Sequence, residues 1–382
     1  MMQEPVGRNM TMRRAELKPK PLKVHAWLAC LAFPAVPAAA QEAPGADEDA
    51  SAPTIARSFG DTGLMARFNS SEQYGAVQAR TGLYTAHANV AQAGGVTTGF
   101  KDDVTTLVTP VNMIMPLRGL GQGVHVKLGY ANILSRGSEG HATQVDNDSQ
   151  TGLAQLLWLI GDQALIGGGV IHEVSNIGLR HNEGGITTQG TGVRVDMLYR
   201  FASNWGASLR ISRLSGEADS KIPNARLGVI ANRQSFRRTY SEASVVGTYR
   251  GAQSAFVPRG WIMRPSAALI WQDSRFSAGT NNLGTAVASR SEQYMLGTAT
   301  VRLEQDGFAP WRVRSYGEAG LEQELRNNVA QVDDDPTSLY IKAGAAMNMG
   351  GKGRLDLYVA RRDSIKGSFQ STTVNLLLSM AF

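Results

Sequence analysis

The sequence is poor in cysteine, in charge and in long apolar runs, and each shortage excludes a class of protein. Its 382 residues include one cysteine, Cys30, which excludes disulfide scaffolds, cysteine-based zinc sites and thiol redox motifs. Only 18% of the residues are charged and 42% are hydrophobic, a mixture found in soluble and in membrane proteins. After the N-terminal region there is no run of 18 apolar residues, so we expect no membrane-spanning helix in the body of the chain. Glycine, in contrast, is abundant at 42 residues, which argues against a mostly helical chain.

Basic residues at the N-terminus lead into the short apolar run VHAWLACLAF at 24–33, and three alanines at 38–40 fit a small-residue cleavage site. We predict a signal peptide over 1–40, with Sec-type export and cleavage near Ala40. Residues 41–73 are predicted to be a flexible lead segment that precedes the folded domain, 74–382.

Processing changes the charge of the protein, whether translation starts at Met1 or at Met12. Removal of residues 1–40 takes away six basic and two acidic residues, which lowers the formal net charge from +6 to +2. The mature chain then lacks the basic surface typical of nucleic-acid binding. We therefore expect no nucleic-acid partner.

The body of the chain alternates with a period of two residues. In GVRVDMLYRF (192–201) one set of alternate positions is apolar and the other is mostly charged, and WGASLRIS (205–212) repeats this pattern after three residues. Such segments are about ten residues long, with aromatic residues near their ends. This favours an antiparallel transmembrane barrel with a lipid-facing exterior and a polar lumen over a secreted soluble β-protein.

Connection lengths give a strand count, because outer-membrane barrels alternate short periplasmic turns with long external loops. If 74–88 is the first strand and the last strand ends in the periplasm, short and long connections alternate over fourteen strands. The segments 74–88 and 151–160 have the weakest strand patterns. The predicted short connections are 349–353, 305–310, 251–260, 202–204, 161–163 and 116–123. The predicted long ones are 363–371, 326–337, 275–290, 215–239, 175–190, 135–150 and 89–103.

The last strand ends in an alternating apolar series that closes on phenylalanine. It resembles the C-terminal assembly signal of Gram-negative outer-membrane barrels. The resemblance implies an outer-membrane location, contact with lipid and lipopolysaccharide, and recognition by the barrel-assembly machinery. The series is Val374, Leu376, Leu378, Met380 and Phe382.

A second resemblance covers roughly the C-terminal two-thirds of the chain. The segments GWIMRPSAALIWQDSRF (260–276) and SYGEAGLEQEL (315–325), with the terminal Phe, are similar to the barrel domain of autotransporters. That family implies twelve strands, a helix in the lumen and a long passenger ahead of the barrel. If the assignment holds, 74–88 is the lumenal helix and one further predicted strand fails. Only 41–73, or at most the chain up to 103, is available as a passenger.

Charged residues on the polar faces of the strands must point into the lumen, because each would be costly in lipid. They either form a salt-bridged plug or line a mixed-charge pore, and the sequence leaves both open. Glu242 and Arg250 join this predicted lumen set. Its other members are Lys127, Arg194, Asp196, Arg200, Arg210, Arg264, Arg302, Glu304, Arg312, Arg314, Glu318, Glu322, Glu324 and Lys342.

A search for chemistry finds no convincing active site. His172 and Ser175 are three residues apart, which places them on opposite faces of a strand, whereas barrel hydrolases need His-x-Ser on one face. We expect no enzyme activity, no cofactor and no metal site. The sequence therefore predicts a passive channel or translocator. The alternatives are an adhesion or structural barrel that uses long external loops such as 215–239, and, third, a barrel hydrolase.

Overall fold

The computed structural model describes residues 59, 63–92, 102–117, 123–137, 145–179, 184–307, 311–328, 336–349, 353–367 and 369–381. All of them belong to one compact unit, Gly45–Phe382. The predicted signal peptide, its cleavage site and the terminal Phe382 lie outside the described residues.

Two helices precede the strands. They are α2 (Gly63–Asn69) and α3 (Glu72–Gln92). The strands are β1 (Asp102–Pro116), β2 (Val124–Gly137), β3 (Val145–Ile160), β4 (Ala164–Leu179), β5 (Gly184–Arg200), β6 (Trp205–Asn224), β7 (Gly228–Gly247), β8 (Tyr249–Arg250), β9 (Trp261–Phe276), β10 (Gly279–Thr280), β11 (Ala286–Val287), β12 (Arg290–Gln305), β13 (Val313–Asn327), β14 (Thr337–Met349), β15 (Gly353–Ser364) and β16 (Phe369–Ala381).

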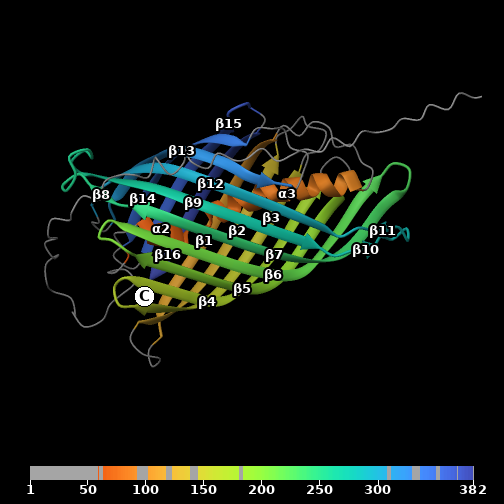
Figure 1. Ribbon diagram of the computed structural model, residues 1–382, viewed down its shortest axis with the longest axis horizontal. Coiled ribbons are helices and arrows are strands. Elements are labelled where there is room, and N and C mark those ends of the chain that lie inside the picture. The colour runs from red at the N-terminus through yellow and green to blue at the C-terminus, as the bar shows by residue number, and fades with distance from the viewer. Residues whose placement is uncertain are drawn as a thin grey trace, which may run out of the picture. The chain divides into compact units, whose positions relative to one another are not determined.

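The long strands form one closed sheet (Figure 1). Each pairs with its neighbour in the sequence, and β9 pairs with both β7 and β12. The two-residue β8 pairs with β9 just beyond the end of β7, and β10 and β11 form a separate hairpin, so the barrel wall has thirteen strands. Closure comes from β1 and β16, which pair in parallel, with Val104 opposite Ser371 and Met113 opposite Met380.

The strand predicted at 74–88 is wrong, because this segment belongs to α3. The other thirteen predicted strands are all present, including the one at 151–160, which forms the second half of β3. The count therefore falls between the predicted fourteen and the twelve implied by the family resemblance. An odd number of strands is the reason that β1 and β16 run in the same direction.

Several long connections predicted from the sequence are also wrong. The segment 215–239 is mostly strand, because β6 and β7 extend to Asn224 and Gly228 and only residues 225–227 join them. Likewise β4 continues to Leu179, well inside the predicted loop at 175–190. These strands extend beyond the apolar band of the barrel. Their ends consist of polar residues, so their composition is typical of loops although they form strands.

Apolar side chains cover the outer surface of the barrel. Val193 and Val195 of β5 are 59% and 47% exposed, whereas Asp196 and Leu198 of the same strand are buried. Leu128 and Tyr130 of β2 are likewise exposed. This inverted pattern is typical of a barrel that faces lipid outside and encloses polar groups inside, and the fold class predicted from the alternation is confirmed.

No described helix is long and apolar enough to cross a membrane.

Candidate functional site in the barrel lumen

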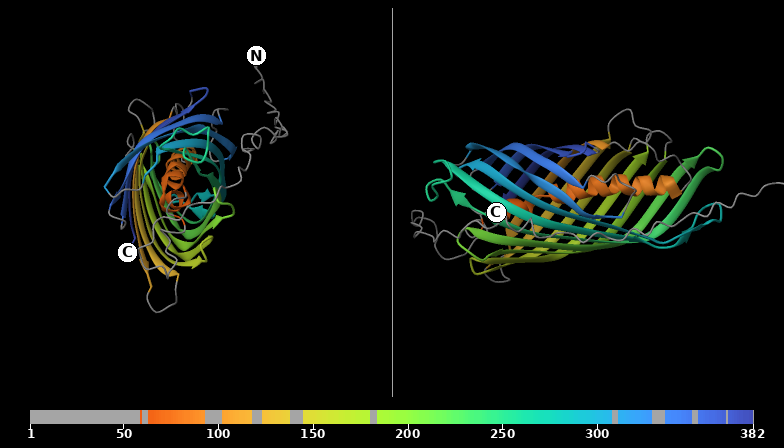
Figure 2. Two further views of the ribbon diagram at one scale, coloured as in Figure 1. Left: turned by 90° about the vertical axis from the view of Figure 1, so that its left-hand side faces the viewer. Right: turned by 45° about the horizontal axis from the view of Figure 1, so that its top comes forward.

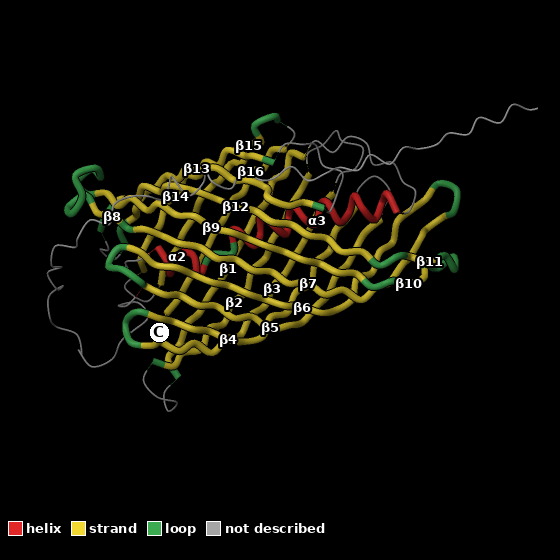
Figure 3. The backbone as a smooth tube through the Cα atoms, in the orientation of Figure 1, coloured by secondary structure: helices red, strands yellow, loops and turns green. Residues whose placement is uncertain are grey.

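Helices α2 and α3 lie inside the barrel, surrounded by strands (Figures 2 and 3). We call the end at which β16 finishes the C-terminal end. Near it, Leu64 and Phe68 of α2 belong to one apolar cluster with Leu198 and Val246. At the opposite end, Val90 joins Leu179, Ile186 and other wall residues in another cluster. Residues 63–92 thus form an internal helical unit that runs along the lumen.

The junction between the helices is held by polar groups. Ser70 Oγ accepts a hydrogen bond from the Glu72 backbone amide at 3.1 Å, so Ser70 caps α3. Lys127 Nζ donates to the Phe68 carbonyl at 3.1 Å, and Arg210 Nη2 donates to the same carbonyl at 3.1 Å. Cations at the C-terminal carbonyls of a helix are favourable because they complement its dipole.

Glu72, the first residue of α3, is only 5% exposed and has partners on two strands, β14 and β15. Its carboxylate accepts hydrogen bonds from Lys342 Nζ at 2.8 Å and Tyr340 Oη at 2.6 Å, and Arg362 Nη2 lies 3.4 Å away. Lys342 also pairs with Glu318 at 3.1 Å. An anion at the start of a helix and inside a ring of donors is strongly held.

Farther along α3, two more polar contacts tie it to the wall. Arg80 Nη1 lies 2.7 Å from Glu324 Oε1 and donates to Tyr294 Oη at 2.8 Å. Gln78 hydrogen-bonds Gln272 at 2.7 Å. The middle of α3 is thus fixed by side chains that face the lumen from β9, β12 and β13.

One wall-to-wall network lies beside these contacts. Arg238 of β7 pairs with Glu173 of β4, and Tyr74 of α3 donates a hydrogen bond to the same carboxylate. Arg238 also donates to Gln78 Oε1 at 2.6 Å. The sequence placed Arg238 in an external loop, and this contact was missed for that reason.

The structure places most of the predicted lumen set in the interior. Nine members are buried, whereas Arg194, Arg302, Glu318 and Glu324 are partly buried and Arg200 pairs with Asp162 at a turn. Arg312 differs, because it is exposed and precedes β13. The nine are Lys127, Asp196, Arg210, Glu242, Arg264, Glu304, Arg314, Glu322 and Lys342.

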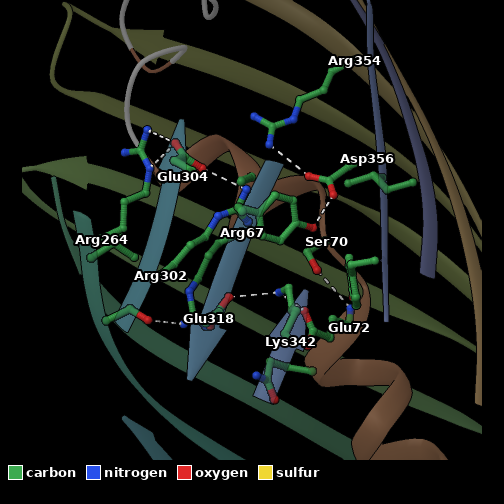
Figure 4. Close-up of a pocket in the computed structure, with 18 of the residues that line it drawn as sticks. Arg67, Ser70, Glu72, Arg264, Arg302, Glu304, Glu318, Lys342, Arg354 and Asp356 are labelled. Atoms are coloured by element: carbon green, nitrogen blue, oxygen red, sulfur yellow. Dashed lines mark hydrogen bonds and ion pairs between the residues drawn. The ribbon is translucent and has the colours of Figure 1, made fainter. Parts of the chain in front are cut away.

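A small cavity remains between the helix junction and the wall at the C-terminal end (Figure 4). Its volume is about 90 Å³. Six basic and five acidic side chains line it.

The candidate catalytic pair behaves as its spacing predicts. His172 is exposed and hydrogen-bonds Thr191 at 2.8 Å, whereas Ser175 is buried and donates to Asn147 at 3.0 Å. The two side chains thus lie on opposite faces of β4. Within the described ranges, no group of three or more His, Cys, Asp or Glu side chains is arranged to hold a metal ion.

Comparisons with known proteins agree on the fold. No family model matches the sequence, and no curated protein matches it. Among solved structures, the β domain of the Bordetella autotransporter BrkA is 13% identical, with a TM-score of 0.50, over 66% of this chain and 95% of that domain.

Two further structures are more distant. The translocator domain of the autotransporter NalP from Neisseria meningitidis is 15% identical over 66% of this chain and 86% of that one, with a TM-score of 0.48. The CymD monoaromatic hydrocarbon channel is 11% identical over 69% and 83%, with a TM-score of 0.38. The likeness to autotransporter barrel domains expected from the sequence is confirmed at the level of the fold, which is that of outer-membrane β-barrels.

Proposed function

We propose that the protein is a passive outer-membrane channel with a mixed-charge lumen that its own helices α2 and α3 close. The observation that carries the proposal is the placement of α3 along the lumen, with Glu72 and Arg80 bound to wall residues. A helix that served only to strengthen the barrel would not need so many charged contacts. Buried ion pairs contribute little net stability, but they define one arrangement of the partners.

The direction of the helices favours a channel over a translocator. α2 lies near the C-terminal end of the barrel, and α3 leads to the opposite end, where β1 begins. If the C-terminal end is in the periplasm, α2 lies near the periplasmic mouth and α3 leads to the external one. A passenger ahead of α2 would then start on the wrong side for surface display.

The adhesion alternative loses its main support, because the predicted loop at 215–239 consists of strands joined by three residues. The hydrolase alternative loses its candidate pair, since His172 and Ser175 point in opposite directions. The fold likeness to autotransporter β domains keeps translocation as the competing outcome of the test below.

A reversible cross-link tests whether the helices close the channel. A Cβ at Gly75 of α3 would lie 3.2 Å from Cγ2 of Val108 in β1, which brings the two positions near disulfide distance. The only native cysteine, Cys30, lies in the predicted signal peptide. The variant Gly75→Cys/Val108→Cys should be silent in planar bilayers when oxidised and should conduct in bursts after reduction.

The two single-cysteine variants are the matched controls and should respond to neither oxidant nor reductant. Equal conductance of the oxidised and reduced double variant would reject closure by the helices. Complete silence of the reduced protein and of a variant without residues 63–92 would reject the channel and leave translocation.

The route to the membrane belongs to the same proposal. Export would remove residues 1–40, and the barrel-assembly machinery would recognise the C-terminal strand through Leu376, Leu378 and Phe382. The support comes from the sequence patterns alone. N-terminal sequencing of protein purified from outer membranes should begin at Gln41, and deletion of Phe382 should lower the amount of assembled barrel several-fold.

A further inference from the structure

Three arginines lie close together on the outer surface of the barrel, on the neighbouring strands β6, β7 and β9 (Figure 1). Arg237 of β7 is directly opposite Arg275 of β9. Arg213 of β6 is opposite Thr239, two residues along β7 from Arg237. All three arginines are exposed. We call Arg213, Arg237 and Arg275 the outer arginine cluster. It faces away from the lumen, so the proposed channel does not use it.

The cluster lies at the edge of the apolar band of the outer surface, on the side away from the C-terminal end. Toward the C-terminal end, the outward residues of these strands are apolar and exposed, for example Ile211 and Leu269. In the other direction they are polar, for example Ser215 and Ser235. Arginine at such an edge keeps its stem on apolar surface and its charge among polar groups. In a membrane, the polar groups at this edge are lipid headgroups.

The cluster has three positive charges and one acid. Arg275 Nε lies 2.8 Å from Asp273 Oδ2, and the other oxygen of Asp273 accepts a hydrogen bond from Ser291 at 3.2 Å. The side chains of Arg213 and Arg237 make no ion pair or hydrogen bond within the described part of the chain. Two of the three guanidinium groups therefore have no counter-charge from the protein.

The other acids on the outward face of β6 belong to a fourth arginine. Arg233 of β7 lies 2.6 Å from Asp219 and 3.9 Å from Glu217. Both acids are farther from the apolar band than the cluster is, with Asp219 opposite Arg233 in the ladder. The row that contains Arg237 and Arg275 ends in uncharged residues on the flanking strands, Thr191 of β5 and Ser291 of β12. The positive excess is thus local to the cluster.

This arrangement requires a negative group from outside the chain. Like charges directly opposite each other destabilise a sheet, and Arg237 and Arg275 form such a pair. An anion between the guanidinium groups would replace their repulsion by attraction. Basic residues beside a membrane attract anionic lipid headgroups, and guanidinium groups bind phosphate oxygens through paired hydrogen bonds.

We propose that the outer arginine cluster binds a phosphorylated glycolipid, a lipid whose headgroup combines phosphate with sugars. The phosphate would lie between the arginines, and the acyl chains would cover the apolar surface around Ile211 and Leu269. The sugars would lie along the polar parts of β6 and β7, which continue past the cluster to Asn224 and Gly228. A glycerophospholipid headgroup is too small to reach along these strands, which is why we favour the glycolipid. The site does not depend on conduction by the channel.

A binding titration on the full chain, refolded in maltoside micelles, tests the site with rough lipopolysaccharide as the phosphorylated glycolipid. Thermophoresis gives the apparent dissociation constant. Arg213→Gln/Arg237→Gln should weaken binding at least tenfold, and so should enzymatic removal of the phosphates from the probe. The matched control is Arg226→Gln, which removes the same charge from the exposed turn between β6 and β7 and should change the affinity less than twofold.

Arg237→Lys keeps the charge without the paired hydrogen bonds, and its affinity should lie between those of the wild type and Arg237→Gln. If the double variant does not fold, Arg237→Gln alone should weaken binding at least threefold. Equal weakening by Arg226→Gln, or equal affinity for the dephosphorylated probe, would overturn the site. Equal affinity for phosphatidylglycerol in the same micelles would also overturn it, because any anionic lipid would then be sufficient. Conductance should be unchanged in all these variants, which separates this site from the proposed channel.

Discussion

Glu72 and Lys342 are separated by 270 positions in the sequence, yet the Lys342 ammonium donates a hydrogen bond to the Glu72 carboxylate at 2.8 Å inside the barrel. The pair joins the start of α3 to the middle of β14. Arg362 and Tyr340 complete the surroundings of the carboxylate. The position of the internal helix is thus determined at one residue by two neighbouring strands, β14 and β15.

Neutralisation of Glu72 should loosen the helix without unfolding the barrel. In Glu72→Gln, Lys342 keeps Glu318 and Arg362 keeps Glu322, so no wall cation is left alone. Loss of a hydrogen bond to a charged group costs about 1.5 to 3 kcal/mol, or roughly ten- to a hundredfold in the docking equilibrium. Planar-bilayer recordings should show a correspondingly higher open probability. Glu217→Gln, at an exposed position, should leave it unchanged.

Arg210 should be coupled to Asp196. Arg210 Nε lies 3.0 Å from Asp196 and its guanidinium also holds the Phe68 carbonyl of α2. Arg210→Met should lower the free energy of unfolding by about 3 to 5 kcal/mol, because it leaves buried acids with fewer partners. Addition of Asp196→Asn should recover part of this loss. Urea unfolding of all four proteins in micelles gives the coupling energy, and strict additivity would contradict the contact.

The close approach of α2 to the wall predicts a steric test. A Cβ at Gly206 would lie 2.4 Å from Cδ1 of the buried Leu64, whereas a Cβ at Gly152 would meet nothing within 4 Å. Gly206→Ala should therefore displace α2 and raise protease cleavage near Leu64, and Gly152→Ala should not. Leu64→Ala in the Gly206→Ala background should restore protection. Full protection of Gly206→Ala alone would show that the helix is not seated against this strand.

The lipid-facing surface can be probed by one substitution at two depths. Val193 lies in the middle of β5 and Val229 at the start of β7, and both are more than half exposed. Arginine costs about 2 to 4 kcal/mol at mid-membrane and about 0 to 1 near the interface. Val193→Arg should destabilise the barrel in phospholipid vesicles by that larger amount and Val229→Arg should have little effect. Similar losses at both sites would place the membrane elsewhere.

The sequence predicts the wall of this barrel better than its contents. Alternation in the strands is imposed by lipid on one side and the lumen on the other, so Val193 and Asp196 could be assigned to opposite faces directly. The sequence of α3 shows no comparable pattern. Tyr74, Val77 and Tyr84 pack in an apolar cluster with wall residues, whereas Glu72 and Arg80 bind the wall through ion pairs. A helix enclosed on several sides has no solvent face, and hence no amphipathic signature.

The same reasoning explains the missed site residues. Arg238 lies where β7 continues beyond the apolar band, inside the loop predicted at 215–239, because polar strand ends have the composition of loops. The arginines at 264, 302 and 314 could be predicted to face inward from parity. The pairing of both Arg264 and Arg302 with Glu304 could not, because it depends on the stagger between neighbouring strands, which the sequence pattern does not reveal.

An odd number of strands has a consequence for how such a chain can be rearranged. In an even-stranded barrel the first and last strands are antiparallel neighbours, so a short turn could join them and new ends could be opened elsewhere. Here β1 starts at the mouth opposite the one where β16 finishes, and a permuted chain would need a connector as long as the barrel itself. α3, with 21 residues and a length of about 32 Å, is already such a connector. Joining the end of β16 to the start of α2 would give a circular chain with the helix as its built-in return path, whereas a chain without α3 could not be closed by any short turn.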